Sequence, residues 1–152
     1  MSIKITTELI KELRESTGIS VMQCKNALEE AEGYMEKALA ILKKTSSDIA
    51  LKKAGRDAKD GRVCIKTDGL PAGKAGKKSV LVTLHCETDF VSKNEDFVNL
   101  ISNLTEKVFK DGVEKMKVEA KDLIDLVIQK TGEKIELGDV YEVKGDVLGN
   151  YV

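Results

Sequence analysis

The sequence predicts an α+β protein, with an amino-terminal three-helix module followed by a small unit of antiparallel strands and helices. Changes in the hydrophobic pattern carry this prediction. Apolar residues recur at helical spacing up to about residue 45, alternate with polar residues from residue 62, and return to helical spacing after residue 94. A chain of 152 residues can hold a small module joined to a slightly larger one. We therefore predict two domains, residues 1–55 and 56–152.

Three short helices are expected within residues 1–45. Gly18 favours a left-handed cap at the end of the first helix, and Ser20 with Gln23 fits a capping box at the start of the second. Gly33 is expected to end the second helix. Helices this short are marginal alone, so they must pack against one another. The apolar residues assigned to these helices are Leu9, Ile10, Leu13, Met22, Ala27, Leu28, Ala31, Ala38, Leu39, Ile41 and Leu42.

Residues 43–62 are charged or small, and we interpret them as a partly helical, solvated linker. Their lysines and arginines raise the alternative of a phosphate-binding patch. However, Asp48, Asp57 and Asp60 interrupt the positive charge, and no aromatic residue is available for stacking on bases. The linker interpretation is therefore favoured.

Two β-rich runs, RVCIKT at 62–67 and SVLVTLHC at 79–86, predict a hairpin. The connection DGLPAGKAGKK is rich in turn formers and does not match the phosphate-binding loop pattern. Ser92 and Glu95 fit a second capping box before a helix at 94–110. A further helix is expected at 119–130, followed by a strand-like, turn-rich tail.

Composition and charge narrow the possible functions. The formal net charge of −1 lacks the basic excess typical of nucleic-acid binding, and no apolar run is long enough to span a bilayer. We expect a cytoplasmic protein with no nucleic-acid, membrane or small-molecule partner, no metal and no cofactor. The three cysteines show no zinc-binding spacing. His85 and Cys86 adjoin on one strand and should point to opposite faces, which disfavours a nucleophile and base pair.

Residues 88–93 must form the corner between the second strand and the next helix. Phe90, one of only three phenylalanines, lies in this corner. It can turn back into the core beside Phe97, as most aromatic residues at corners do. Alternatively, Asp89 and Phe90 project outward as a charged and aromatic probe, which is typical of a binding anchor. Physical reasoning alone favours the buried orientation.

Two stretches resemble a known family. LRESTGISVMQCKNALEEAEG at 13–33 and LHCETDFVSKNEDF at 84–97 are similar to the two signatures of the elongation factor Ts family. The stretches KAGRDAKDGR and TGEKIELGDVYEVKGDVLGNYV also fit, so the resemblance covers essentially the whole chain. It implies a UBA-like domain that docks on the GTPase elongation factor Tu, followed by the first half of the core domain. Because that family usually continues further, we expect a fragment or a truncated form.

The resemblance also implies a function and its residues. Members of the family promote GDP release from elongation factor Tu without covalent chemistry, so no catalytic residue is expected. In the family the Asp-Phe pair enters near the partner's nucleotide and magnesium site, and the amino-terminal helices contact its GTPase domain. Val21 stands where a methionine is usual. The residues carried over are Thr88, Asp89, Phe90 and Val91 in the magnesium-displacing loop, and Arg14, Val21 and Met22 in the docking helices.

Two alternatives remain open. The three helices could be a UBA-like module that binds a ubiquitin-like or helical partner without exchange activity. A Cys86-dependent enzyme is the second alternative, and it would require a reactive thiolate.

Overall fold

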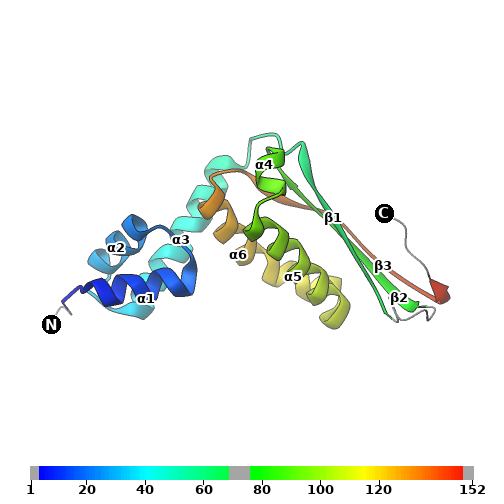
Figure 1. Cartoon of the computed structure of the whole chain (residues 1–152), viewed down its shortest axis with the longest axis horizontal. Helices are drawn as coiled ribbons and strands as arrows, with labels where there is room; N and C mark the ends of the chain where they lie inside the picture. The colour runs from blue at the N-terminus through cyan, green and yellow to red at the C-terminus, as the bar shows by residue number, and fades with distance from the viewer. Residues whose placement is uncertain (1–3, 69–75, 149–152) are drawn as a thin grey trace.

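The computed structural model describes residues 4–68 and 76–148. Within these ranges it contains six helices and one three-stranded antiparallel sheet, which confirms the α+β class. The molecule is elongated, with the first three helices at one end and the sheet reaching toward the other (Figure 1).

The amino-terminal helices are α1 (Thr7–Thr17), α2 (Val21–Glu30) and α3 (Met35–Lys53). Gly18 caps α1 with a left-handed φ of 68°, as the sequence predicts. The Ser20 hydroxyl accepts the Gln23 amide at the start of α2. The capping box is only half correct, because the Gln23 side chain accepts the Ser20 hydroxyl rather than its backbone N–H.

The linker prediction requires a correction. Helix α3 does not end near residue 45 but continues to Lys53. Its second half packs against α6 (Val113–Thr131), and Ser46 is buried at this contact. The charged composition therefore describes the exposed face of a long helix, while the small residues allow the other face to approach α6.

The sheet has the order β1-β2-β3, with β1 (Asp60–Thr67), β2 (Gly76–Cys86) and β3 (Ile135–Leu148). The predicted hairpin is confirmed, with Asp60 opposite Cys86 at one end and Thr67 opposite Ser79 at the other. Most of its connection, residues 69–75, lies outside the described residues. The tail is not turn-rich up to Leu148 but forms one long strand along β2, with irregular register at two places.

Three helices follow β2. They are α4 (Asp89–Ser92), α5 (Glu95–Asp111) and α6. The predicted second capping box is wrong. Asn94 caps α5 by accepting the Asp96 amide, and the Ser92 hydroxyl instead donates to the Asp89 carbonyl inside α4. Helix α6 also begins six residues before the predicted start at Glu119, because Gly112 alone separates it from α5.

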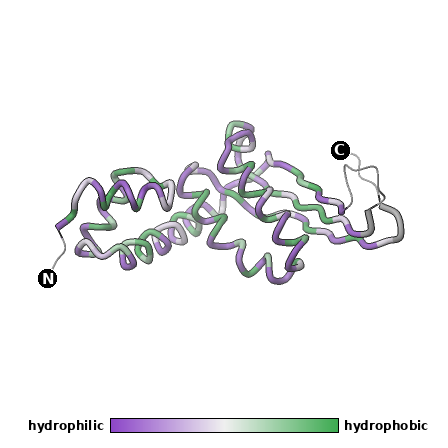
Figure 2. Tube along the Cα trace, turned by 60° about the horizontal axis from the view of Figure 1, so that its bottom comes forward, coloured by the Kyte–Doolittle hydropathy of each residue, from purple (hydrophilic) through white to green (hydrophobic). Residues whose placement is uncertain are grey.

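Hydrophobic residues form two clusters. One lies among α1–α3, with Leu13, Cys24 and Leu28 fully buried, and the other lies between the sheet and α5–α6, around Phe97 and Leu104. Figure 2 shows hydrophobic positions recurring along the helices and strands of both regions. The clusters touch, because Leu126 of α6 packs against the first, while residues 49 and 50 of α3 pack against the second.

Candidate partner-binding site

The corner after β2 presents one aromatic side chain to solvent. Phe90 is 84% exposed in the first turn of α4, whereas Phe97, seven residues later in α5, is fully buried. The Phe90 side chain therefore points outward into solvent, and the expectation that it turns back into the core beside Phe97 is wrong. Helix α4 lies at the end of the sheet nearest the amino-terminal helices (Figure 1). We call Asp89 and Phe90 the tip.

A carboxylate from another segment fixes the start of the corner. Glu133, just after α6, accepts the Thr88 amide at 3.0 Å and the Glu87 amide at 3.2 Å. Its other oxygen accepts the Thr88 hydroxyl at 2.6 Å. A carboxylate that accepts several N–H and O–H groups makes strong, charge-assisted bonds. The backbone immediately before the tip is therefore held in one conformation.

Three further bonds hold the corner. The Glu87 carboxylate accepts the Lys134 amide at 2.7 Å and pairs with Arg56 at 3.3 Å. The Lys134 amide is the main reason that the pKa of Glu87 is lowered, with Arg56 adding to it. On the other side, the Arg62 side chain donates to the Ser92 carbonyl at 2.5 Å. The tip thus sits on a framework tied to β1, to the segment after α3 and to the residue just before β3.

The four predicted residues of this loop differ in exposure. Asp89 and Phe90 are exposed, Thr88 is half-buried, and Val91 is 8% exposed within the core cluster. The Lys93 ammonium bonds to the Asp89 carboxylate at 2.9 Å and is the main cause of its lowered pKa. Of these four residues, only Asp89 and Phe90 are exposed to solvent, while Thr88 and Val91 hold the loop against the rest of the protein.

The residues of the second predicted set are each exposed on the amino-terminal helices. Arg14 lies in the last turn of α1, and Val21 and Met22 begin α2. Val21 is 51% and Met22 66% exposed, so two consecutive apolar side chains face solvent at the start of α2. We call Arg14, Val21 and Met22 the docking surface.

The enzyme alternative is opposed by the surroundings of Cys86. Its side chain is buried and its thiol donates to the Thr88 carbonyl at 3.1 Å. Burial, together with the nearby Asp60 and Glu133 carboxylates, raises the pKa of this thiol to about 11. A thiol with that pKa stays protonated at neutral pH and is a poor nucleophile. His85 is half-buried on the opposite face, as the strand geometry predicts.

Neither a metal site nor a membrane span is found in the described parts of the chain. Residues 4–68 and 76–148 hold no group of three His, Cys, Asp or Glu side chains placed to bind a metal ion. In the same ranges, every helix is too short or too polar to cross a bilayer.

Comparison with known proteins places the chain in a family. The model of the family described as elongation factor TS matches residues 87–152. The elongation factor Ts of Pseudomonas syringae pv. tomato is 36% identical over 152 residues, which cover 98% of this chain and 50% of that protein. The chain belongs to the elongation factor Ts family.

Other elongation factor Ts proteins are similar to this chain to the same degree. That of Christiangramia forsetii is 35% identical, with 98% of this chain and 55% of that protein covered. That of Rhodopirellula baltica is 34% identical, with 97% of this chain and 46% of that protein covered. The chain thus spans about half the length of the curated relatives it matches.

The sequence reasoning missed the residues that hold the tip in place. Glu133 lies 45 residues from Thr88, and Arg62 lies 30 residues from Ser92. Each is an ordinary charged residue at the end of a predicted element, and no spacing rule links it to the corner. Only the pairing of β2 with β3 brings Glu133 there.

Proposed function

We propose that this chain is a nucleotide exchange factor that binds the GDP-bound form of elongation factor Tu and promotes release of GDP. The observation that carries the proposal is Phe90, which is 84% exposed on a corner fixed by hydrogen bonds to Glu133 and Arg62. Leaving an aromatic ring in water forgoes about 1.5–3 kcal/mol of burial free energy. A rigid, exposed ring suits insertion into a partner's pocket, because little conformational entropy is lost on binding.

The proposed mechanism is a difference in binding and involves no covalent step. The tip enters beside the magnesium and phosphate site, with Phe90 wedged between helices of the partner. The partner conformation that accepts the ring then holds magnesium and phosphate poorly. By linkage, the factor and GDP weaken each other's binding to the same extent.

The docking surface would supply the initial attachment. In this proposal α1–α3 form a UBA-like domain, separated from the core near residue 55, and present Arg14, Val21 and Met22 to the GTPase domain. Val21 and Met22 provide apolar contact area, and methionine adapts readily to irregular surfaces. Arg14 provides a charge that is exposed and placed to pair across the interface. We expect the protein to act in the cytoplasm, without a small-molecule substrate or cofactor of its own.

Linkage supplies a direct test. Fluorescent GDP is bound to purified elongation factor Tu, and its release is followed as this chain is added at rising concentration. We expect GDP release to become faster as the chain is added. We also expect two equal effects on affinity: added GDP should weaken binding of the chain to elongation factor Tu as many-fold as the chain weakens binding of GDP. Binding that neither speeds release nor responds to GDP would refute exchange and leave a docking module.

A further inference from the structure

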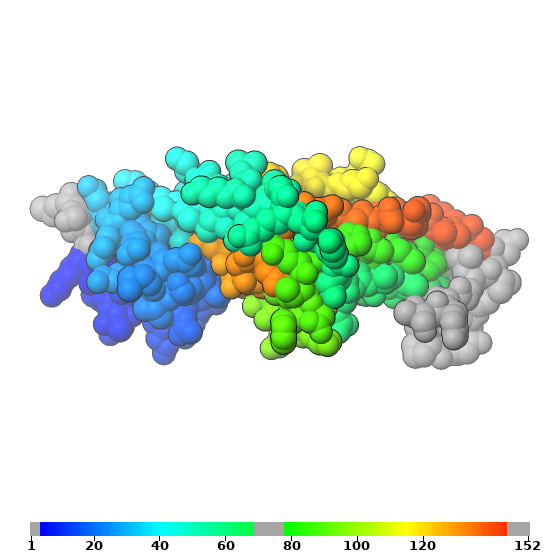
Figure 3. Space-filling view, turned by 90° about the horizontal axis from the view of Figure 1, so that it is seen from above, coloured from blue at the N-terminus to red at the C-terminus, as the bar shows by residue number. Residues whose placement is uncertain are grey.

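The end of α6 and the residues just after it contact segments next to both surfaces to which we assign partner contacts. Residues 129–133, which we call the junction, contact α3, the Gly18 cap of α1, α5 and the corner in turn. In Figure 3 the orange surface near residue 130 lies between the blue amino-terminal helices and the green region that follows β2. The contacts of Gln129, Lys130 and Glu133 show how this segment connects the two regions.

Lys130 bridges the amino-terminal helices and α5. Its ammonium lies directly over Gly18, so that a Cβ added to that glycine would be 2.7 Å from the Lys130 nitrogen. Gly18 caps the carboxyl end of α1, where the helix dipole attracts a cation. The same nitrogen is 3.7 Å from a carboxylate oxygen of Asp96 in the first turn of α5. With 19% of its side chain exposed, Lys130 is well shielded for a lysine.

The residues on either side of Lys130 extend the connection. Gln129 is buried and its side-chain amide is hydrogen-bonded to the Ser46 hydroxyl of α3. Three residues beyond Lys130, Glu133 holds the Thr88 amide and hydroxyl. Three residues span at most about 11 Å even when extended. The contacts that hold α1 and the tip are therefore fixed to one short segment.

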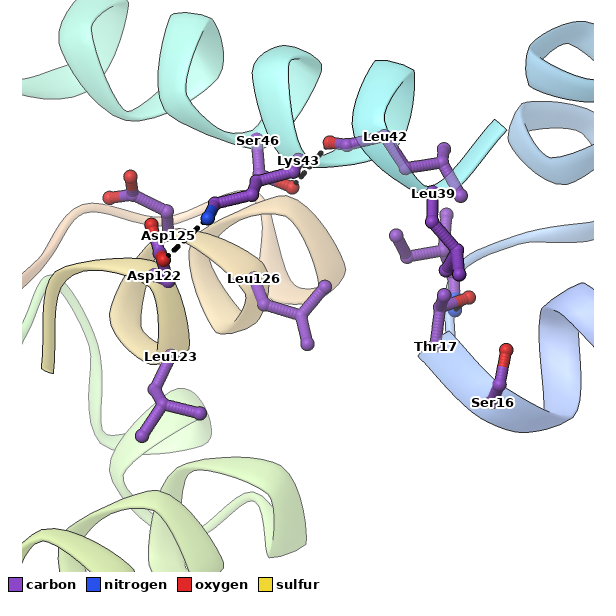
Figure 4. Close-up of a pocket in the computed structure, with 11 residues that line it drawn as sticks. Ser16, Thr17, Leu39, Leu42, Lys43, Ser46, Asp122, Leu123, Asp125 and Leu126 are labelled. Atoms are coloured by element: carbon purple, nitrogen blue, oxygen red, sulfur yellow. Dashed lines mark hydrogen bonds and ion pairs between the residues drawn. The ribbon is translucent and has the colours of Figure 1, made fainter. Parts of the chain in front are cut away.

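Apolar packing alone does not fix the amino-terminal helices here. A cavity of about 320 Å³ separates the turn after α1 from α3 and α6. In Figure 4 the side chains of Leu39, Leu126 and Leu123 border this space without filling it. The ion pair across it, Lys43 to Asp122 at 2.8 Å, joins two exposed side chains and contributes little. The polar contacts of the junction therefore add to the packing of α3 on α6 in setting the angle between the two parts.

We propose that the junction fixes the spacing between the docking surface and the tip, so that both engage one partner molecule together, and that Lys130 is its main positioning residue. This inference rests on the proposed function. Gly18 lies between Arg14 and Val21 in sequence, and Thr88 directly precedes the tip. A loosened junction would leave each surface intact but let their separation vary. The docked complex would then present the tip correctly only part of the time.

The matched variants are Lys130→Met, which keeps the length but removes the charge, and Lys130→Arg, which restores a cation. A second variant, Gln129→Leu, removes the bond to Ser46 by a different substitution. Each variant is first checked for an unchanged circular dichroism spectrum. Spin labels at Glu30→Cys in α2 and Asn103→Cys in α5, both exposed, report the distance between the two parts. The half-buried Cys64 is replaced by serine, and the buried Cys24 and Cys86 are retained.

The inference predicts a narrow distance distribution in the parent, a broader one in Lys130→Met and Gln129→Leu, and recovery in Lys130→Arg. In GDP release from elongation factor Tu, Lys130→Met should lower the maximum rate about tenfold, since misplacing a contributing group by an ångström can cost up to about a hundredfold. The concentration giving half of the maximum rate should stay close to that of the parent, because the docking surface is unchanged.

Two results would overturn the inference. One is a distance distribution for Lys130→Met and Gln129→Leu as narrow as that of the parent. The other is a broadened distribution with a parental maximum rate, which would show that the spacing does not matter for release. Failure of the parent chain itself to release GDP would refute the proposed function instead, while the distance measurement would still decide whether Lys130 fixes the spacing.

Discussion

Replacing Glu133 with alanine should weaken the corner by an amount that the structure allows us to calculate. The carboxylate accepts three hydrogen bonds, from the Glu87 amide, the Thr88 amide and the Thr88 hydroxyl. Buried hydrogen bonds to charged groups contribute about 1.5–3 kcal/mol each, but this site is half-buried and water can replace part of each bond. At about 1 kcal/mol per bond, we expect a loss of about 3 kcal/mol in the free energy of unfolding.

Urea unfolding followed by circular dichroism measures this loss, and amide hydrogen exchange at Thr88 locates it. Glu133→Gln is the matched control. Its amide oxygen can still accept from the two backbone N–H groups, and the Thr88 hydroxyl can rotate to accept from the amide nitrogen. We therefore expect a loss of about 1 kcal/mol, from the lost charge alone. An unfolding midpoint and a Thr88 exchange rate unchanged in Glu133→Ala would refute the role given to this carboxylate.

Four further predictions follow from burial and ionisation. Leu28→Ala should cost about 2–5 kcal/mol in thermal unfolding because it opens a cavity in the first cluster, whereas Met22→Ala should stay within about 0.5 kcal/mol; equal losses would contradict the assigned burial. Iodoacetamide near pH 8 should modify Cys64 before Cys86, and rapid reaction at Cys86 would contradict its protonated, buried state. Folding raises the pKa of the Cys86 thiol from its ordinary value of 9.0 to about 11, so the folded protein holds this proton more tightly than the unfolded chain. The resulting contribution to the free energy of unfolding should be complete below pH 9 and decrease toward about pH 11. A Cys86→Ala variant whose free energy of unfolding falls by as much over this range would contradict this role. The lowered Glu87 pKa acts in the opposite direction. The contribution of the charged Glu87 carboxylate to the free energy of unfolding should be present above the ordinary carboxyl pKa and lost in more acidic solution. NMR shifts of the Lys134 amide that stay constant through that acid range would contradict this prediction.

Local patterns predicted most elements of this fold because their signals are local. The φ of Gly18, the alternation along β1 and the helical repeat of α5 each depend on neighbouring residues. The errors occur where tertiary contacts decide. Helix α3 continues through a charged stretch because one of its faces packs on α6, and Asn94 displaces Ser92 as the cap once Ser92 is taken into α4.

The candidate site was predicted only in part. The family resemblance supplied Asp89, Phe90 and the docking surface, but physical reasoning favoured a buried Phe90. That preference fails because Val91 and Phe97 already fill the core beneath the corner. Lys130 and Glu133 carried no signal in the sequence, since their partners lie far away along the chain.

The role proposed for Phe90 is tested most directly by comparing two exposed apolar residues in GDP release from elongation factor Tu. Phe90 and Val118 are 84% and 81% exposed, so neither Phe90→Ala nor Val118→Ala should change the unfolding free energy by more than about 0.5 kcal/mol. At saturating concentration of the factor, we predict that Val118→Ala releases GDP at the parental rate and that Phe90→Ala loses most of the acceleration. A parental rate with Phe90→Ala would contradict the central claim that this ring drives exchange.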